Sequence, residues 1–205
     1  MLNPLSPEFV PDDYFRQLSI AEVFPSRPDA ALELDIGCGD GGFLLQIAEL
    51  YPAHNFVGIE RVKGRIHLIE GKIRSKNLTN VRLLRLDSSY AIGWLFPDAC
   101  ASRMHLLCPD PWPKKKHHKN RIIRDQEFLG GIPRLLSDGG EFLLKTDQED
   151  YFEESLEQID PVIGLNRIDW QDDAFPYPTT DFEAQWLSMG RSINRARWQR
   201  QPRSS

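Results

Sequence analysis

One segment combines a residue suited to chemistry with residues suited to binding an anion. Asp110 lies between two prolines and close to Trp112, and a run of lysine, histidine and arginine begins directly after Pro113. Prolines fix the backbone φ angle and remove hydrogen-bond donors, so this loop is stiff and holds its carboxylate in place. The chain as a whole has a net charge of −5, so the basic run is a local feature. The pattern predicts a reactive carboxylate beside a surface that binds a polyanion.

Acidic residues also mark the ends of the predicted strands. Short apolar runs indicate buried strands at 30–36, 55–60, 81–87, 102–108 and 140–145. The carboxyl ends of parallel strands meet at one edge of a sheet, and ligands bind outside that edge. We therefore expect a ligand site there, formed by the acidic residues that end or follow these runs: Asp35, Glu60, Asp87, Asp110 and Asp147.

A glycine-rich turn follows the first of these strands. Gly37 and Gly39 fit G-x-G-x-x-G with Gly42, which is typical of dinucleotide sites, and G-x-G-x-G with Gly41, which is typical of S-adenosylmethionine sites. The spacing does not separate the two, but the charges do, because nearby carboxylates would repel a pyrophosphate. S-adenosylmethionine instead offers a cationic amino group, a ribose diol and an adenine amine. We expect these groups to meet Asp35, Glu60 and Asp87, in that order.

The elements that position these residues alternate between strand and helix. Helical spacing of apolar residues predicts helices at 43–50, 62–76, 125–136 and 148–159. The alternation predicts an α/β protein with a doubly wound, Rossmann-like sheet that is mostly parallel. Residues 162–170 and 183–193 are expected to add a terminal antiparallel pair. We expect an irregular N-terminal arm (1–28), a catalytic domain (29–194) and a basic, frayed C-terminal tail (195–205).

Composition narrows the class of protein. The 205 residues are 40% hydrophobic and 27% charged, which is ordinary for one globular domain. Three cysteines form no disulfide framework, and neither a signal peptide nor a membrane span is expected, so we predict a cytoplasmic protein. Adjacent histidines such as His117 and His118 point apart and lack partners at metal-ligand spacing, so no metal site is expected.

The chain resembles a known family through these motifs. Between about residues 31 and 191 it carries Asp35-Ile36-Gly37-Cys38-Gly39, Gly58-Ile59-Glu60, the segment from Pro109 to Lys119, Thr146-Asp147 and Thr180-Asp181-Phe182-Glu183. In these motifs it is similar to the bacterial TrmB family, the tRNA (guanine-N7-)-methyltransferases. The Asp-Pro-Trp loop with its basic tract is the most specific part. The resemblance implies a class I methyltransferase fold, S-adenosyl-L-methionine as cofactor, and methylation of N7 of the guanosine at position 46 in the variable loop of tRNA.

The resemblance also implies roles for individual residues. Asp110 would be the catalytic carboxylate. Cofactor binding would involve Asp35, Gly37, Gly39, Glu60, Asp87 and Asp110. Substrate binding would involve Lys114, Asp147, Thr180, Asp181, Phe182 and Glu183. The RNA-contacting stretch would consist of Lys116, His117, His118, Lys119, Asn120 and Arg121. Two departures stand out, since the family usually has glutamate at Asp35 and often a second arginine at Asn120.

The chemistry of guanine N7 leaves several roles open. N7 has an in-plane lone pair and no proton, so methyl transfer depends mainly on alignment, and a carboxylate can stabilise the charge that develops on the ring. Asp110 and Asp147 are both candidates for that carboxylate and for the guanine N1–H and amino group, and Glu183 is a candidate for another base edge. Trp112 is equally suited to stacking and to packing. Thr180 is a candidate helix cap or phosphate contact, and Phe182 a candidate core residue.

Other function classes make different predictions. A methyltransferase for a small molecule or protein would have no use for the basic tract, and a non-catalytic RNA-binding module would not bind the cofactor. An NAD-linked oxidoreductase would need a hydride-transfer residue, and the chain shows no obvious one at the fourth strand. The oligomeric state, monomer or homodimer, stays open. The arginines from Arg191 onward are either an extension of the RNA surface or a solvated tail.

Overall fold

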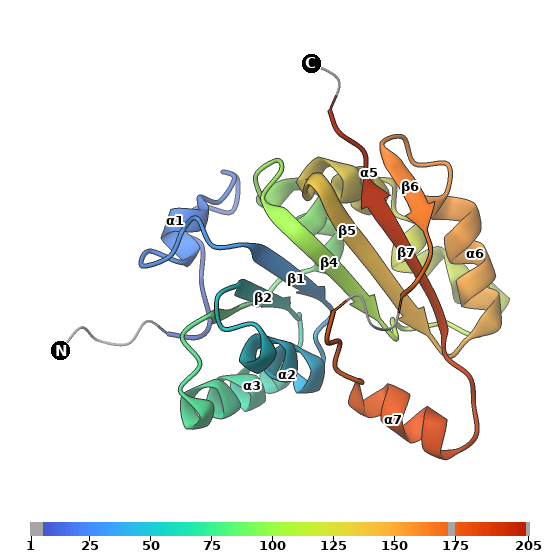
Figure 1. Cartoon of the computed structure of the whole chain (residues 1–205), viewed down its shortest axis with the longest axis horizontal. Helices are drawn as coiled ribbons and strands as arrows, with labels where there is room; N and C mark the ends of the chain where they lie inside the picture. Colours follow the sequence, from blue (N-terminus) through green and yellow to red (C-terminus); the bar gives the residue numbers. More distant parts are fainter. Residues whose placement is uncertain (1–5, 172–174, 204–205) are drawn as a thin grey trace.

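The computed structural model describes residues 6–171 and 175–203, which form a seven-stranded sheet between helices (Figure 1). The strand order is β3-β2-β1-β4-β5-β7-β6, with β1 to β5 parallel and β7 antiparallel to both of its neighbours. The strands are β1 (Leu32–Ile36), β2 (Asn55–Ile59), β3 (Val81–Leu84), β4 (Ala101–Leu107), β5 (Leu136–Thr146), β6 (Leu165–Ile168) and β7 (Asn194–Arg200). The predicted mostly parallel α/β sheet with a terminal antiparallel strand is confirmed.

Two hydrophobic cores lie on the two faces of this sheet. One packs α2 (Gly42–Leu50) and α3 (Lys63–Lys76) against β2 and β3. The other packs α5 (Gln126–Leu135) and α6 (Glu149–Ile159) against β1, β4, β5 and Trp198 of β7. All residues of β1 and β2 are buried, as expected for central strands with helices on both faces. None of the helices in the described part of the chain is long and apolar enough to cross a membrane.

The strand order reverses between β1 and β4. β2 and β4 both pair with β1, one on each side. The sheet therefore extends from β1 in two opposite directions. In doubly wound sheets such a switch point opens a crevice at the carboxyl ends of the strands. The glycine turn follows β1 and the Asp110 loop follows β4, so both segments begin at this crevice.

The C-terminal part differs from the prediction. Residues 183–193 do not form a strand, because Thr180 and Glu183 form a capping box that starts the helix α7 (Asp181–Ser188). The predicted frayed tail is also wrong from Arg195 to Arg200, because these residues lie in β7, between β5 and β6. The arginines of β7 leave few apolar residues in it, so the hydrophobic pattern of the sequence did not indicate a strand there. Only Ala196 and Trp198 face the core, while the alternate residues face the other side.

The N-terminal arm packs on the protein itself. Leu83 of β3 donates a backbone hydrogen bond to Pro7 (2.8 Å), and Phe9 donates one to Leu83 (2.8 Å), so the arm continues the sheet at its edge. A single helical turn, α1 (Ile20–Val23), follows. Val23 and Phe24 then enter the larger core. The described arm residues therefore pack against the sheet edge and the larger core.

Candidate active site

The glycine turn after β1 leaves room for a ligand. Gly37, Gly39 and Gly41 have φ angles of 72°, 59° and 81°, a region that glycine adopts without strain. The amides of Gly37 and Cys38 both donate to the carbonyl of Ile59 (2.9 and 3.0 Å), which ties the turn to β2. A Cβ added at Gly37 or Gly39 would meet no atom within 4 Å, so the space above the turn is open. The turn can therefore bring backbone close to a ligand.

Asp35 places a buried carboxyl group beside this turn. Asp35 is 4% exposed. Burial raises the pKa of its carboxyl group from 3.8 to about 7, and the nearby charge of Glu60 is a smaller cause. No salt bridge among the described residues involves Asp35. A buried carboxyl group without a salt bridge favours a cationic partner, because a positive charge nearby would stabilise its ionised form. The amino group of S-adenosylmethionine fits this requirement.

Glu60 and Asp87 stand at the carboxyl ends of β2 and β3, as predicted. Glu60 is buried; its Oε1 accepts from the amide of Val62 (2.8 Å) and its Oε2 from Arg65 (3.3 Å). Asp87 is exposed, and its Oδ1 caps the short helix α4 (Ser88–Tyr90). An ionised carboxylate accepts about four hydrogen bonds, so both groups keep capacity for a ribose diol and an adenine amine. The three acids and the turn thus fit S-adenosylmethionine.

The Asp110 loop leaves β4 in an unusual backbone conformation. Cys108 and Trp112 have φ angles of 48° and 47°, which are uncommon for residues with a Cβ. The Trp112 ring lies 6.0 Å from the ring of His117 at 21°, so it stacks on the basic tract. Asp110 itself is exposed to solvent. The loop therefore displays a carboxylate at the switch point and connects it directly to the cationic segment.

Arg121 requires a correction, because it is a buried structural residue. Its side chain is 1% exposed, and it donates to Glu154 (2.5 Å), to Asp150 (2.6 Å) and to the carbonyl of Pro111 (2.8 Å). Burial lowers the pKa of the guanidinium, but the hydrogen bonds to the two carboxylates outweigh this and raise it. Every side of the guanidinium is engaged, so the prediction that Arg121 contacts RNA is wrong. Its bond to Pro111 instead anchors the Asp110 loop to α6.

The rest of the basic tract forms the 3-10 helix η2 (Lys115–Asn120) on the surface. The side chains of Lys114, Lys116, Lys119 and Asn120 are exposed, whereas His117 and His118 are half-buried. Short 3-10 turns point successive residues to different sides, so the tract covers a broad patch. No three His, Cys, Asp or Glu side chains within the described ranges are placed to hold a metal ion.

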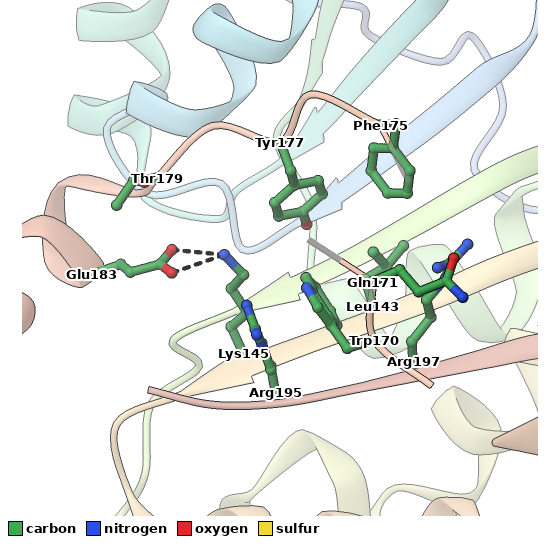
Figure 2. Close-up of a pocket in the computed structure, with 10 residues that line it drawn as sticks. All are labelled: Leu143, Lys145, Trp170, Gln171, Phe175, Tyr177, Thr179, Glu183, Arg195 and Arg197. Atoms are coloured by element: carbon green, nitrogen blue, oxygen red, sulfur yellow. Dashed lines mark hydrogen bonds and ion pairs between the residues drawn. The ribbon is translucent and has the colours of Figure 1, made fainter. Parts of the chain in front are cut away.

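The start of α7 is fastened to the end of β5. Thr180 Oγ1 accepts from the amide of Glu183 (2.9 Å), which confirms that Thr180 is a cap. Lys145 Nζ donates to both Glu183 carboxylate oxygens (2.8 and 2.9 Å), and Figure 2 shows the two side chains pointing toward each other. The side chains of Asp181 and Phe182 lie outside the described residues.

Asp147 lies at the same end of β5, where its Oδ2 accepts from Gln148 (2.5 Å). Burial, then the charges of Asp147 and Glu183, raises the pKa of the Cys108 thiol to about 11. The Cys108 amide donates to the carbonyl of Lys145 (2.8 Å) and Lys145 pairs with Glu183, so the ends of β4 and β5 converge with the start of α7. Asp110, Asp147 and the Thr180–Glu183 segment therefore belong to one edge of the molecule.

Sequence reasoning missed two buried polar groups. Lys145 is 5% exposed, and the only signal was a lysine in an apolar strand just before Thr146-Asp147. Glu33 is fully buried; although burial opposes its ionisation, the hydrogen bond and charge of His105 and the charge of Arg103 lower its pKa to about 2. His105 Nδ1 lies 2.8 Å from the hydroxyl of Tyr177. This network fixes the segment that leads into α7.

Comparisons with known proteins identify relatives of this chain. A family model described as a putative methyltransferase, Methyltransf_4, matches residues 29–196. A tRNA (guanine-N(7)-)-methyltransferase of Chlorobium phaeobacteroides is 38% identical over 161 residues, which are 77% of this chain and 76% of the relative. The enzyme of the same name from Marinobacter nauticus is 36% identical over 169 residues, which are 80% of this chain and 71% of the relative.

Solved structures support the fold. The aminoglycoside resistance methyltransferase NpmB1 superposes with a TM-score of 0.63 at 21% identity, over 90% of this chain and 94% of that one. The 16S rRNA methyltransferase KamB superposes with a TM-score of 0.64 at 18% identity, over 91% of this chain and 95% of that one. These similarities show the fold, and the family model with the tRNA (guanine-N(7)-)-methyltransferase relatives shows that the chain belongs to the Methyltransf_4 (TrmB) family of methyltransferases.

Proposed function

We propose that this protein is an S-adenosylmethionine-dependent tRNA (guanine-N7)-methyltransferase that modifies the guanosine at position 46 in the variable loop. Family membership supports the assignment of the reaction as methyl transfer to tRNA. The observation that carries the residue assignment is the switch point, where the Asp110 loop, the open glycine turn and the basic tract meet. We further propose that the protein works in the cytoplasm, as a monomer or a homodimer.

The cofactor side holds the methyl donor by its polar groups. Ionised Asp35 pairs with the amino group, Glu60 accepts from the ribose hydroxyls, and Asp87 accepts from the adenine amine. Gly37 and Gly39 let the backbone approach without a Cβ clash. When bound, S-adenosylmethionine supplies an electrophilic methyl group on a sulfonium. The residues of this side therefore orient that group toward the end of β4.

The substrate side aligns the base and stabilises charge. Guanine N7 would attack the methyl carbon with its in-plane lone pair while the bond from that carbon to the sulfonium sulfur breaks and S-adenosylhomocysteine leaves, so no residue needs to remove a proton. Asp110 lies at the end of β4 and stabilises the positive charge that forms on the ring, which is the kind of fixed electrostatic effect that lowers a barrier most. Asp147 and Glu183 accept from the N1–H and amino group of guanine, which adenine does not offer together.

The basic tract delivers the RNA. Lys114, Lys116 and Lys119 are exposed beside the Asp110 loop and contact phosphates, which supply most of the affinity of such surfaces. A base that lies within the tertiary structure of tRNA must leave its stack to react. The stiff loop between Pro109 and Pro113 keeps the phosphate contacts in register with the carboxylate.

Methyl transfer to a defined tRNA tests this function. We expect radiolabel from S-adenosylmethionine in unmodified tRNA that carries guanosine at position 46, and none in the same tRNA with adenosine there. Equal labelling of the two would contradict the position. Cofactor binding without any labelling would favour a non-catalytic RNA-binding module, and unchanged labelling after neutralising Lys114, Lys116 and Lys119 would favour a small-molecule or protein substrate.

A further inference from the structure

Residues 175–180 connect the cofactor side of the site to the substrate side. This segment leads into α7 (Figure 1). Tyr51, which follows α2, donates from its hydroxyl to the carbonyl of Pro176 (2.9 Å). The Arg103 guanidinium of β4 lies 3.9 Å from the Phe175 ring centre. The segment is therefore fastened to the body of the protein before α7 begins.

Tyr177 joins this segment to the interior of the sheet, and Figure 2 shows its ring pointing toward the strands. Its hydroxyl lies 2.8 Å from Nδ1 of His105, whose Nε2 lies 2.9 Å from Glu33. The last two residues are fully buried. The pKa of Glu33 is lowered to about 2, so its ionised carboxylate only accepts, and His105 Nε2 donates to it. In the neutral ring Nδ1 then accepts from the Tyr177 hydroxyl, which gives a hydrogen-bond chain from the segment to β4 and β1.

The same tyrosine contacts the cofactor side. His105 pairs in register with Asp35 across β4 and β1, so the two side chains lie on the same face of the sheet. The Tyr177 ring packs 5.1 Å from the ring of Phe43, the second residue of the helix that follows the glycine turn. Burial raises the pKa of the Tyr177 hydroxyl well above its usual value, and the charge of Asp35 is the next cause. Tyr177 therefore senses both the glycine turn and the carboxylate assigned to the cofactor.

Tyr177 also contacts the substrate side. Lys145 Nζ lies 4.8 Å from the Tyr177 ring centre and pairs with Glu183 in the first turn of α7. Toward its end the helix has little cover, since Leu187 and Met189 are 53% and 59% exposed. The position of α7 therefore depends on its first turn and on the segment before it.

We propose that Tyr177 is a positioning residue that couples the cofactor site to the tRNA site. With the cofactor bound at Asp35, the glycine turn and Phe43 are fixed against the Tyr177 ring, which orders the start of α7. A tRNA that meets an ordered α7 loses less conformational freedom on binding, so each ligand strengthens the binding of the other. The inference rests on the proposed function for the identity of the two ligands.

Calorimetry with S-adenosylhomocysteine tests the coupling without turnover, because this product keeps the amino group and the adenosine but has no methyl group to transfer. Saturating unmodified tRNA should raise its affinity for the wild-type protein about fivefold or more, as is typical of coupled sites. In Tyr177→Phe, which loses only the hydroxyl, this increase should disappear. The affinity of that variant for S-adenosylhomocysteine alone should change little.

Tyr51→Phe is the matched control. It removes a hydroxyl that holds the same segment through Pro176, but at the end of α2 far from the glycine turn. It should therefore keep the wild-type increase in affinity. A wild-type increase in correctly folded Tyr177→Phe, or an equal loss in Tyr51→Phe, would overturn the role of Tyr177.

Hydrogen exchange of the wild-type protein gives a second test that needs no variant. Adding S-adenosylhomocysteine should slow the exchange of backbone amides in α7, and unchanged exchange there would contradict the coupling. Methylation of tRNA by a protein without any coupling would also contradict it and would leave the proposed function intact. Coupled binding of the two ligands with no methylation would instead sink the proposed function alone.

Discussion

The cofactor side and the substrate side of the site are stabilised by different interactions. On the cofactor side, Asp35 is buried without a salt bridge among the described residues, and its pKa rises to about 7. On the substrate side, the buried cations Arg121 and Lys145 are each paired with carboxylates from distant parts of the chain. The first side leaves a buried charge for a ligand to satisfy, whereas the second pairs its buried cations within the protein.

This difference separates groups that bind from groups that position. A buried charge costs free energy unless it is paired, so an unpaired carboxyl is tolerated where a ligand completes it. A paired cation such as Arg121 cannot also serve a ligand, but it holds the backbone to which it donates. Its bond to Pro111 fixes the Asp110 loop, just as Lys145 fixes α7 through Glu183. Removing a positioning group should therefore damage the fold, and removing a binding group should damage function.

The largest effect is expected for Arg121→Met. Glu154 would keep a buried charge with a poorer partner, so the free energy of unfolding should fall by about 3–5 kcal/mol. Arg124→Met is a matched control, because Arg124 also pairs with Glu154 but is 46% exposed, and it should cost about 1 kcal/mol or less. Urea denaturation measures both. Normal stability of Arg121→Met together with weakened tRNA binding would restore Arg121 as an RNA contact.

Asp110→Ala should keep its fold and lose catalysis. The loss of a fixed charge aimed at the developing cation should lower kcat about 10²-fold. Affinity for S-adenosylmethionine, measured by calorimetry, should change little. Asp98→Ala is the control, because that carboxylate is 69% exposed and pairs with Arg134 away from the switch point. A collapse of cofactor affinity with normal kcat would assign Asp110 to the cofactor side.

The same difference decides what the sequence could predict. The acids and glycines assigned to the cofactor side could be proposed from the sequence because the acids end apolar strands and the glycines follow a known spacing, and both signals are local in the chain. Arg121 looked like one more cation of the basic tract, because its partners on α6 lie about 30 residues away. β7 was missed for a related reason, since Arg197 pairs with Glu141 on the neighbouring strand β5, which lies far away in the chain. Pairing between distant segments leaves no local pattern.

The pKa of Asp35 predicts how cofactor affinity depends on pH. The ionised carboxylate pairs with the amino group, so affinity should fall about tenfold per pH unit below about 7 and level off above it. The free protein holds the proton more tightly folded than unfolded, so its stability should fall as the pH rises from about 4 to 7. Calorimetric titrations from pH 5.5 to 8 measure the affinity. Asp35→Asn should bind weakly and without this dependence, and an equal dependence in that variant would assign the proton elsewhere.

The smallest effect is expected on the exposed basic tract, where single charges are screened. Lys116→Gln and Lys119→Gln should each weaken tRNA binding a few-fold and lower the salt slope by about 0.7–0.9, because each removes one phosphate contact. Lys76→Gln, on α3 beside Glu49, should change neither quantity. Stability and cofactor affinity should stay normal in all three variants, unlike in Arg121→Met. An unchanged salt slope for both tract variants would mean that the tRNA approaches from another surface of the protein.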